Sequence, residues 1–558
     1  MTPEINVLII TADQWRADCL SVLGHPTVET PHLDALAADG VLFRRHYAQC
    51  TPCGPSRASL HTGMYLMNHR SVRNGTPLDP RFTNVALEAR KAGYAPSLIG
   101  YTDTSVDPRR HHPNDPALRT YSGTLPGYKQ LVPGSESEIA WLRSLAAKGY
   151  AVPERTFDIY YPDPDKPGTG ERGPTFQPTS YKAEDSDTAF VADRALDFLR
   201  VEGRRPWFLH LSFLRPHPPF FAPEPYNALY DPDRVPGYRR APSPEEEARQ
   251  HPYLAFLLRH FRARDDFDER RYPQSEPAMR QLRATYYGLI AEVDHHLGRL
   301  FTWLKEQGLY ERTLVVFTTD HGEQLWDHWL LGKEAYFEQS FHIPLIVRAP
   351  GSRFDRGRGR QVTAFTESVD VTPTVLDLIG QDMPVQCDGA SLTCFLRGEQ
   401  PPRWRREAHW EHDFRDVVAG APEAELGIGL DECTLSVIRG ERYKYIHFTA
   451  LPPLLFDLQA DPDELTDLAR DPARRDVLLD CAQSMLSWRM AHGERILTGV
   501  QLTPRGPVER PRDGRGAPGA SSWASGEQAQ ETSMPQKTPM PSAAGSSMMQ
   551  SIGDPSGD

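Results

Sequence analysis

The sequence of 558 residues lacks the features that mark several special classes of protein. It contains only seven cysteines, and an odd, small number in a chain of this length argues against a framework of disulfides. No apolar run is long enough to resemble a transmembrane span. Residues 1–10 place an acidic side chain before a short apolar run, without a small-residue cleavage site, which predicts a first strand rather than a secretory signal. We therefore expect a cytoplasmic protein with no membrane partner.

An excess of positive charge is also missing. Lysine and arginine number 62 against 75 aspartates and glutamates, which gives a net charge of −13. This balance provides no general affinity for nucleic acid or for anionic membranes, so we expect no nucleic-acid partner. A small anionic substrate would need a pocket that is locally positive.

What the sequence does contain is an alternation of strand-like apolar runs and helix-like segments. The expected strands cover residues 5–11, 95–100, 207–213, 314–317 and 343–347. The expected helices cover residues 30–40, 87–93, 187–200, 284–307 and 368–377. Such an alternation predicts an α/β fold, with a large, mostly parallel sheet flanked by helices over residues 1–400.

The pattern changes after residue 400. The next segments predict antiparallel strands and a closing helix, at residues 407–414, 434–438, 443–448, 454–458 and 475–492. They indicate a smaller C-terminal α+β domain over residues 401–500. Residues 501–558 are rich in proline, glycine, serine, glutamine and methionine without apolar periodicity, which predicts a disordered tail.

The most informative stretch is residues 49–63, which place Cys53 where a helix is expected to begin. Pro55 suits a first helical turn, because its φ is fixed and its missing N–H is not needed there. The free N–H groups and the dipole at this end favour an anion. Arg57, about one turn on, adds a planar fork that fits phosphate or sulfate oxygens.

Several roles are open to Cys53. With Cys50 it forms a C-x-x-C, as in half of a zinc site or a redox pair, although the other five cysteines form no second C-x-x-C. As the nucleophile of a thiolate phosphatase it would need an arginine six residues on, where the sequence has Ser59. The remaining alternatives are a buried structural cysteine and a site of modification.

Polar side chains follow the expected strands at two places that suit a metal ion. Asp13 and Gln14 follow the first strand, and Asp320 and His321 follow a later one. In open α/β sheets, ligands bind outside the carboxyl ends of the strands. These oxygen donors and one imidazole suit Mn²⁺, Ca²⁺ or Mg²⁺ better than a soft ion. Capping of a helix or a turn is the structural alternative.

The order Cys53, Pro55 and Arg57 within Cys-x-Pro-x-Arg, followed by Thr62-Gly63, resembles the signature of the sulfatase family, in which the cysteine is oxidised to formylglycine. From about residue 7 to residue 492 the chain resembles the alkaline phosphatase superfamily. Within it, the chain is most similar to the formylglycine-dependent phosphonate monoester hydrolases and phosphodiesterases. The motifs that carry this likeness are Asp13-Gln14 and residues 53–57, 215–220, 320–323 and 331–333.

The resemblance implies the composition of a site. Asp13, Gln14, formylglycine at Cys53, Asp320 and His321 would hold one divalent metal ion, with Mn²⁺ favoured and Ca²⁺ or Mg²⁺ as alternatives. Arg57, His217 and Lys333 would act in catalysis, and Asn74 and Tyr101 would bind the substrate. The resemblance also implies a formylglycine-generating enzyme as a maturation partner and, by analogy, a homotetramer. A turn at Asn74, a loop cap at His217 and a surface position for Lys333 are the structural alternatives.

By the same resemblance, the hydrated aldehyde would attack phosphorus or sulfur through one hydroxyl and release the transferred group through the other. Arg57 and Lys333 would neutralise the charge that builds up on this group. His217 or Lys333 would protonate the leaving oxygen. Because no second attack on phosphorus or sulfur is needed, we expect promiscuity among phosphonate monoesters, phosphodiesters and sulfate esters.

Three departures from the usual pattern bear on the substrate. Gln14 and His321 stand where ordinary sulfatases carry aspartate and asparagine, which favours phosphonate and phosphate esters over sulfate monoesters. Asp103 stands where a threonine-rich stretch is expected, and its carboxylate would disfavour a dianionic substrate. An arylsulfatase is the nearest alternative function. A phosphotransferase or mutase, and a binding protein with a decayed site, are the others.

Overall fold

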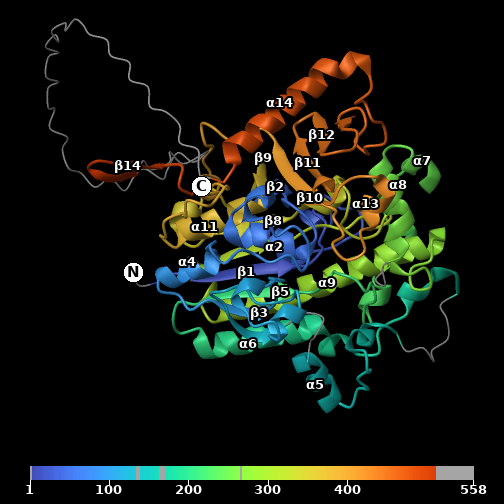
Figure 1. Cartoon of the computed structure of the whole chain (residues 1–558). Coiled ribbons are helices and arrows are strands. Elements are labelled where there is room, and N and C mark those ends of the chain that lie inside the picture. Colours follow the sequence, from blue (N-terminus) through green and yellow to red (C-terminus); the bar gives the residue numbers. More distant parts are fainter. Residues whose placement is uncertain (1–2, 134–138, 163–169, 264–266, 495, 510–558) are drawn as a thin grey trace, which may run out of the picture. The chain divides into compact units, whose positions relative to one another are not determined.

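A sheet of nine strands is the largest element of the computed structural model, which describes residues 3–133, 139–162, 170–263, 267–494 and 496–509. The strand order is β4-β3-β5-β1-β6-β8-β2-β7, and β9 also pairs with β2. Figure 1 labels β3, β5, β1, β8, β2 and β9 of this sheet. The strands are β1 (Asn6–Ala12), β2 (Val41–Tyr47), β3 (Ser97–Gly100), β4 (Lys129–Pro133), β5 (Phe208–Phe213), β6 (Thr313–Thr318), β7 (His342–Ile343), β8 (Leu345–Arg348) and β9 (Arg360–Glu367).

The neighbouring strands β3, β5, β1 and β6 all run parallel. Beyond β6 the sheet is mixed, because β8 is antiparallel to both β6 and β2. The single strand expected at residues 343–347 is divided into β7 and β8 at Pro344, which has no N–H to donate to a ladder. The predicted α/β fold is confirmed, and its parallel part holds the four strand ends that carry polar side chains.

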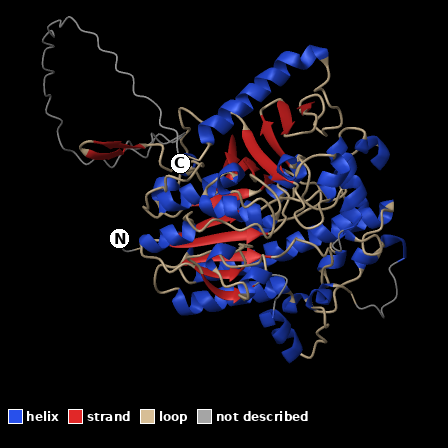
Figure 2. Cartoon of the chain, viewed as in Figure 1, coloured by secondary structure: helices blue, strands red, loops and turns tan. Residues whose placement is uncertain are grey.

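Helices cover both faces of this sheet (Figure 2). On β1 the side chains of Leu8 and Ile10 belong to one apolar cluster and those of Val7 and Ile9 to another. The first cluster includes residues of α1 (Pro31–Asp39), α6 (Asp187–Glu202) and α9 (Glu276–Glu306). The second includes residues of α2 (Cys53–Thr62), α4 (Val85–Lys91) and α11 (Val371–Leu378). Because both faces are covered, β1 is apolar along nearly its whole length.

The remaining helices are shorter or lie in connecting segments. They are α3 (Leu66–His69), α5 (Ile139–Ala147), α7 (Pro244–Ala248), α8 (Pro252–His260), α10 (Glu338–Phe341), α12 (Thr393–Leu396) and α13 (Ala421–Leu426). Among the described residues, no helix has both the length and the apolar character that crossing a membrane requires.

A second, antiparallel sheet follows residue 400, as expected. Its order is β10 (Ala408–Asp413), β11 (Thr434–Arg439), β12 (Tyr443–Phe448) and β13 (Leu454–Asp457), and α14 (Arg475–His492) packs on it through Met485. Trp410 of β10 stacks on Tyr47 of the large sheet, with ring centroids 5.5 Å apart. The described residues fall in one compact unit, and the predicted boundary at residue 400 stays a prediction.

The predicted tail begins differently from the expectation. Strands β14 (Val500–Thr503) and β15 (Gly506–Glu509) form an antiparallel pair within residues expected to be disordered. Gly506 has a φ of 105°, which permits the tight turn between them. The rest of the predicted tail, residues 510–558, lies outside the described residues.

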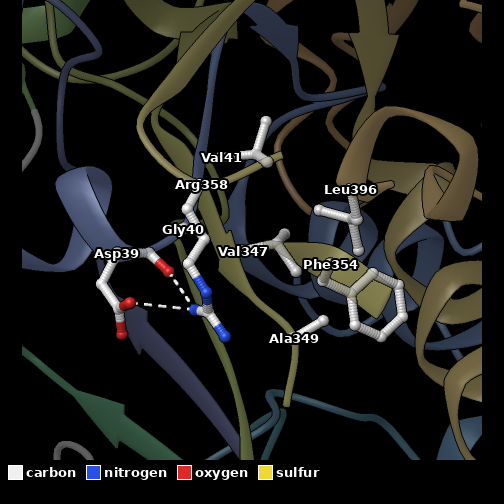
Figure 3. Close-up of a pocket in the computed structure, with 8 residues that line it drawn as sticks. All are labelled: Asp39, Gly40, Val41, Val347, Ala349, Phe354, Arg358 and Leu396. Carbon is white, nitrogen blue, oxygen red and sulfur yellow. Dashed lines mark hydrogen bonds and ion pairs between the residues drawn. The ribbon is translucent and has the colours of Figure 1, made fainter. Parts of the chain in front are cut away.

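A small cavity of about 10 Å³ lies between β2, β8 and Leu396 (Figure 3). Arg358 closes one side by donating to Oδ1 of Asp39 over 2.9 Å. This volume accommodates about one water molecule, so the cavity is a packing defect rather than a ligand site.

Candidate active site

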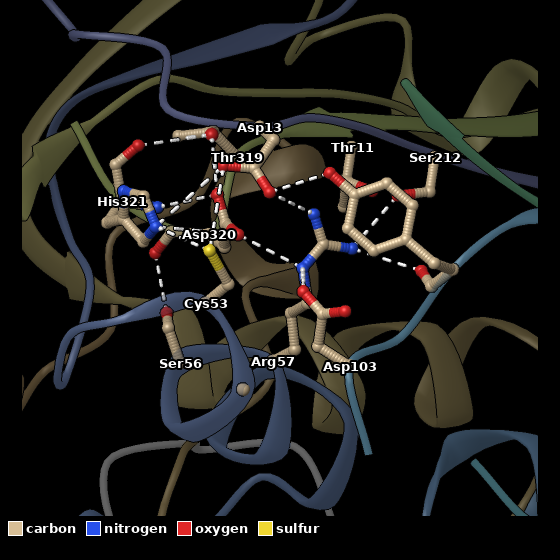
Figure 4. Close-up of polar contacts among 12 residues, drawn as sticks. Thr11, Asp13, Cys53, Ser56, Arg57, Asp103, Ser212, Thr319, Asp320 and His321 are labelled. Carbon is tan, nitrogen blue, oxygen red and sulfur yellow. Dashed lines mark hydrogen bonds and ion pairs between the residues drawn. The ribbon is translucent and has the colours of Figure 1, made fainter. Parts of the chain in front are cut away.

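The candidate site lies where four parallel strands of the large sheet end. Asp13 follows β1, Tyr101 follows β3, and Asp320 follows β6, while His217 lies in the segment after β5. Strands β3, β5, β1 and β6 are adjacent and parallel, so their carboxyl ends meet at one edge. The first turn of α2 brings Cys53 to the same edge (Figure 4).

Four side chains converge there in a geometry suited to a metal ion. One ligand atom from each of Asp13, Cys53, Asp320 and His321 lies within 4.8 Å of all the others. All four side chains are buried, and no second group of this kind occurs in the described part of the chain. Nδ1 of His321 donates to the carbonyl oxygen of Gly322 (3.0 Å), which leaves the lone pair of Nε2 facing the cluster. Nε2 lies 3.2 Å from Sγ of Cys53.

The electrostatics of this cluster fit a divalent cation. Burial and repulsion from Asp320 raise the pKa of Asp13 above its usual value. Burial alone would raise the pKa of Asp320 as well, but His321, Arg57 and Lys333 hold it well below its usual value. Two buried carboxylates that repel each other are stabilised by a cation between them, and oxygen and imidazole donors suit a hard or borderline ion.

Arg57 is fully buried and joins the cluster to the strand ends by hydrogen bonds. Its Nε donates to Oδ2 of Asp320 (3.0 Å) and its Nη2 to Oδ2 of Asp13 (3.0 Å). Its Nη1 donates to the carbonyl oxygen of Tyr101 (3.1 Å) and to Oγ of Ser212 (2.9 Å). Four of its N–H groups are therefore used within the protein, and two of them hold the carboxylates of Asp13 and Asp320. The contact of Arg57 with substrate stays a prediction.

Tyr101 also acts on the cluster. Its hydroxyl donates to Oδ2 of Asp13 over 2.7 Å, and its ring lies 4.2 Å from the Arg57 guanidinium carbon. Asn74 lies on the other side of Cys53, where its Oδ1 accepts the free N–H of Gly54 (2.9 Å) at the start of α2. The sequence placed both residues near the site, and their contact with substrate stays a prediction.

Lys333 and His217 lie beside Cys53, with Lys333 buried and His217 half-buried. Nζ of Lys333 lies 3.0 Å from Sγ of Cys53 and 3.2 Å from Nε2 of His217. Nδ1 of His217 donates to the carbonyl oxygen of Pro218 (2.7 Å), so Nε2 can accept from the lysine. Burial opposes the charge on Lys333, but Cys53, Asp13 and Asp320 raise its pKa above the usual value. Lys333 therefore carries the proton that the pair shares.

Asp103 is a further carboxylate beside Arg57. Its backbone has a φ of 46°, which is uncommon for a residue other than glycine, and its Oδ2 lies 3.9 Å from Nε of Arg57. Burial, with repulsion from Asp13 and Asp320, raises the pKa of Asp103 to about 7 although Arg57 opposes the shift. Asp103 therefore carries its full negative charge only above about pH 7, and it lies outside the group of candidate metal ligands.

Three residues at the site were not assigned a role from the sequence. Ser212 is a polar residue inside the buried strand β5, which is the signal that could have identified it. Glu323 belongs to the 320–323 motif and contacts Gln14. Tyr286 of α9 donates to the carbonyl oxygen of Gln14 (2.7 Å), and nothing in its helical segment distinguishes it from a core tyrosine.

Comparison with known proteins places this geometry in a family. A model of the sulfatase family matches residues 5–381. The chain belongs to the sulfatase family. A second model, described as the C-terminal part of N-sulphoglucosamine sulphohydrolase, matches residues 326–491. The predicted family and the predicted fold are thus both confirmed.

Closer relatives of this sulfatase-family chain cover almost all of it. The multifunctional alkaline phosphatase superfamily protein PehA of Trinickia caryophylli is 44% identical over 519 residues, which are 90% of this chain and 99% of that protein. The crystal structure of the phosphonate monoester hydrolase of Agrobacterium radiobacter is 46% identical with a TM-score of 0.85, over 91% of this chain and 100% of that one. The phosphonate monoester hydrolase of Silicibacter pomeroyi is 42% identical with the same TM-score, over 91% and 99%.

Proposed function

We propose that this sulfatase-family protein hydrolyses phosphonate monoesters and phosphodiesters, with a formylglycine made from Cys53 and one divalent metal ion. The observation that carries the proposal is the position of Cys53 at the start of α2, within 3.2 Å of His321 and 3.0 Å of Lys333. The two phosphonate monoester hydrolase structures and the multifunctional relative support this substrate class.

The environment of the thiol argues for modification rather than thiolate chemistry. Burial and the nearby Asp13 raise the pKa of Cys53 well above its usual value, despite Lys333. A cysteine that stays protonated is a weak nucleophile, which disfavours the thiolate phosphatase alternative. A hydrated aldehyde at this position would supply two hydroxyls, one to attack the ester and one to release the transferred group.

Asp13, Gln14, Asp320 and His321 would hold the metal ion together with residue 53, and Mn²⁺ is the favoured ion for this donor set. The ion would supply Lewis-acid polarisation of an ester oxygen. The protein's own residues do the rest. Arg57 holds the carboxylates of Asp13 and Asp320 in place by its two charged hydrogen bonds.

Lys333 and His217 would assist the departure of the leaving group. Lys333 holds a proton 3.2 Å from Nε2 of His217, so this pair can deliver it to the oxygen that departs from phosphorus. The positive charge of Lys333 also faces the position of the transferred group and stabilises the charge that develops on it. Proton delivery and charge stabilisation thus come from one side chain.

The test combines mass spectrometry with a substrate panel. In the tryptic peptide of residues 46–57, we expect residue 53 to have exchanged H₂S for O, with Cys50 unchanged. With one chromogenic alcohol, the phosphodiester and the phosphonate monoester should react faster than the sulfate monoester. Cys53→Ala should lower kcat/KM by about a thousandfold or more, whereas Cys50→Ser should keep the modification and the activity.

An unmodified Cys53 in fully active protein would contradict the proposed nucleophile. A modified protein that prefers the sulfate ester would instead establish the arylsulfatase alternative. The same mass measurement tests the maturation partner. If residue 53 is modified in a host that lacks a formylglycine-generating enzyme, that enzyme is not the partner.

A further inference from the structure

Glu323 is a buried carboxylate with a fixed partner for each oxygen. It lies two residues after His321 and is 0% exposed. Its Oε1 accepts the backbone N–H groups of Leu325 (3.1 Å) and Gly332 (2.6 Å). Its Oε2 accepts a hydrogen bond from Nε2 of Gln14. No step of the proposed reaction uses this side chain.

The contact with Glu323 determines how the amide of Gln14 is turned. A carboxylate offers only acceptors, so the amide must present its NH₂ end to Glu323. The amide oxygen then lies on the opposite side, where it accepts from Nζ of Lys333 over 3.0 Å. An amide oxygen is a ligand for Mg²⁺, Ca²⁺ or Mn²⁺, and the NH₂ group has no lone pair available for one.

Two further hydrogen bonds of Gln14 involve its main chain. Its N–H donates to Oδ1 of Asp320 (3.2 Å), and its carbonyl oxygen accepts from Tyr286 (2.7 Å). These bonds hold a backbone with a φ of 69°, but they leave the amide group free to turn over by 180°. Two contacts distinguish the two orientations: Glu323 accepts from the NH₂ end, and Lys333 donates to the oxygen end.

Glu323 acts on a second part of the site through its other oxygen. Gly332, whose N–H it accepts, directly precedes Lys333. The segment that carries the lysine is therefore anchored to the same carboxylate that orients Gln14. One side chain sets the relative position of a metal-ligand candidate and of the proton donor.

We propose that Glu323 is a positioning residue that selects the amide orientation of Gln14 and thereby turns its oxygen toward the metal ion. The inference rests on the metal-dependent function proposed above. In this arrangement a glutamine can act as a metal ligand at a position where a carboxylate would otherwise be needed. The amide oxygen faces Nζ of Lys333, which lies beside Cys53, and the amide NH₂ group satisfies a buried acceptor.

The first variant is Glu323→Gln. The oxygen of the new amide can still accept from Leu325 and Gly332, so its NH₂ group would face the NH₂ group of Gln14. Turning Gln14 over relieves this clash, although it gives up the hydrogen bond from Lys333, and it withdraws the amide oxygen from the proposed metal site. We expect the affinity for Mn²⁺ to fall by about tenfold or more. The measurement is an electron paramagnetic resonance titration of free Mn²⁺ at pH 8 for the wild type and the variant.

The double variant Gln14→Glu with Glu323→Gln reverses the direction of the same hydrogen bond. The new amide at position 323 is then the donor and the new carboxylate at position 14 the acceptor, so an oxygen again faces the metal site with no change in net charge. We expect the Mn²⁺ affinity to return to within about threefold of the wild type. Gln14→Glu alone places two carboxylates face to face and should bind less tightly than the double variant.

Glu399→Gln, an exposed position far along the chain, is the matched control and should bind Mn²⁺ as the wild type does. Wild-type affinity in Glu323→Gln, or a double variant no better than that single variant, would overturn the inference. A wild-type protein that binds no divalent ion would overturn both this inference and the proposed metal dependence. A protein that binds Mn²⁺ but hydrolyses neither phosphorus ester would overturn the proposed function alone.

Discussion

The single side chain of Arg57 forms hydrogen bonds to residues at or near the ends of four strands. Its guanidinium reaches Asp13 after β1, Tyr101 after β3, Ser212 in β5 and Asp320 after β6. The cost of burying this charge is offset by two carboxylates and two neutral acceptors. The same bonds hold two of the carboxylates that would bind the proposed metal ion, so Arg57 would serve both the fold and the proposed reaction.

Asp103 offers a test of substrate charge at this scale. Asp103→Asn removes a negative charge 3.9 Å from Arg57 without changing the size of the side chain. At pH 8, above the pKa of about 7, we expect the kcat/KM for a dianionic phosphate monoester to rise about tenfold relative to that for a monoanionic diester, because one repulsion is removed. Rates on the two nitrophenyl esters give this ratio.

Asp115→Asn is the control for that variant, because Asp115 is partly exposed and pairs with His111 away from the site. Its ratio of the two rates should equal that of the wild type. If Asp103→Asn also leaves the ratio unchanged, Asp103 does not act on the charge of the substrate.

Helix α14 shows how one element supports the site from the C-terminal part. The ring of Trp488 stacks on His409 of β10 with centroids 4.3 Å apart and meets Tyr65 at 4.9 Å. Tyr65 directly precedes α3, and its hydroxyl donates to Glu367 over 2.6 Å. Through Trp488, helix α14 therefore contacts the segment that follows α2.

Trp488→Ala should lower the free energy of unfolding by about 3 kcal/mol, because it opens a cavity between α14, β10 and Tyr65. Urea denaturation followed by circular dichroism measures this change. Leu486→Ala on the same helix removes a side chain that is 59% exposed and should cost less than about 0.5 kcal/mol. Equal losses in the two variants would show that Trp488 is not part of the core.

The elements differ in how far the sequence predicts them. Strands β1, β3, β5 and β6 are buried on both faces, so they appear as continuous apolar runs that end in polar residues. Strand β2 was not predicted, because Arg44, which is exposed, and Arg45, which is half-buried, interrupt its apolar run. The same physical reason applies to β9, whose first residues are exposed.

The site divides in a similar way. Short motifs predict the residues around Cys53 and Asp320 because their spacing along the chain is itself the signal. The contacts Arg57–Ser212 and Tyr286–Gln14 join segments 155 and 272 residues apart, and they depend on strand order and helix packing. Local patterns in the sequence carry no record of that order.

Glu292 of α9 gives the whole molecule a predicted pH dependence. Burial and repulsion from Asp187 raise its pKa from 4.5 to about 8. Between these values the carboxyl is ionised in the unfolded chain but protonated in the folded one. Its contribution to stability is complete below pH 4.5 and is lost as the pH rises through 8, by at most about 1.4 kcal/mol per pH unit.

Glu292→Gln should remove this part of the dependence, so the variant should gain stability over the wild type as the pH rises from 5 to 8. Urea unfolding free energies at several pH values measure the difference. Glu306→Gln, at an exposed position of the same helix, should follow the wild type at every pH. A constant difference between Glu292→Gln and the wild type would contradict the assigned pKa.

The distance along the chain between the parts of the site also sets an order of events during folding. Gln14 and Asp320 meet although they are 306 positions apart in the chain, so the proposed metal site forms only after β1 and β6 have paired. No shorter piece of the growing chain can hold it. Cys53, by contrast, is 4% exposed once the sheet is complete. If Cys53 is oxidised as proposed, the enzyme that modifies it would have to reach the thiol before the sheet is complete. Maturation and catalysis would then belong to successive periods in the life of one molecule.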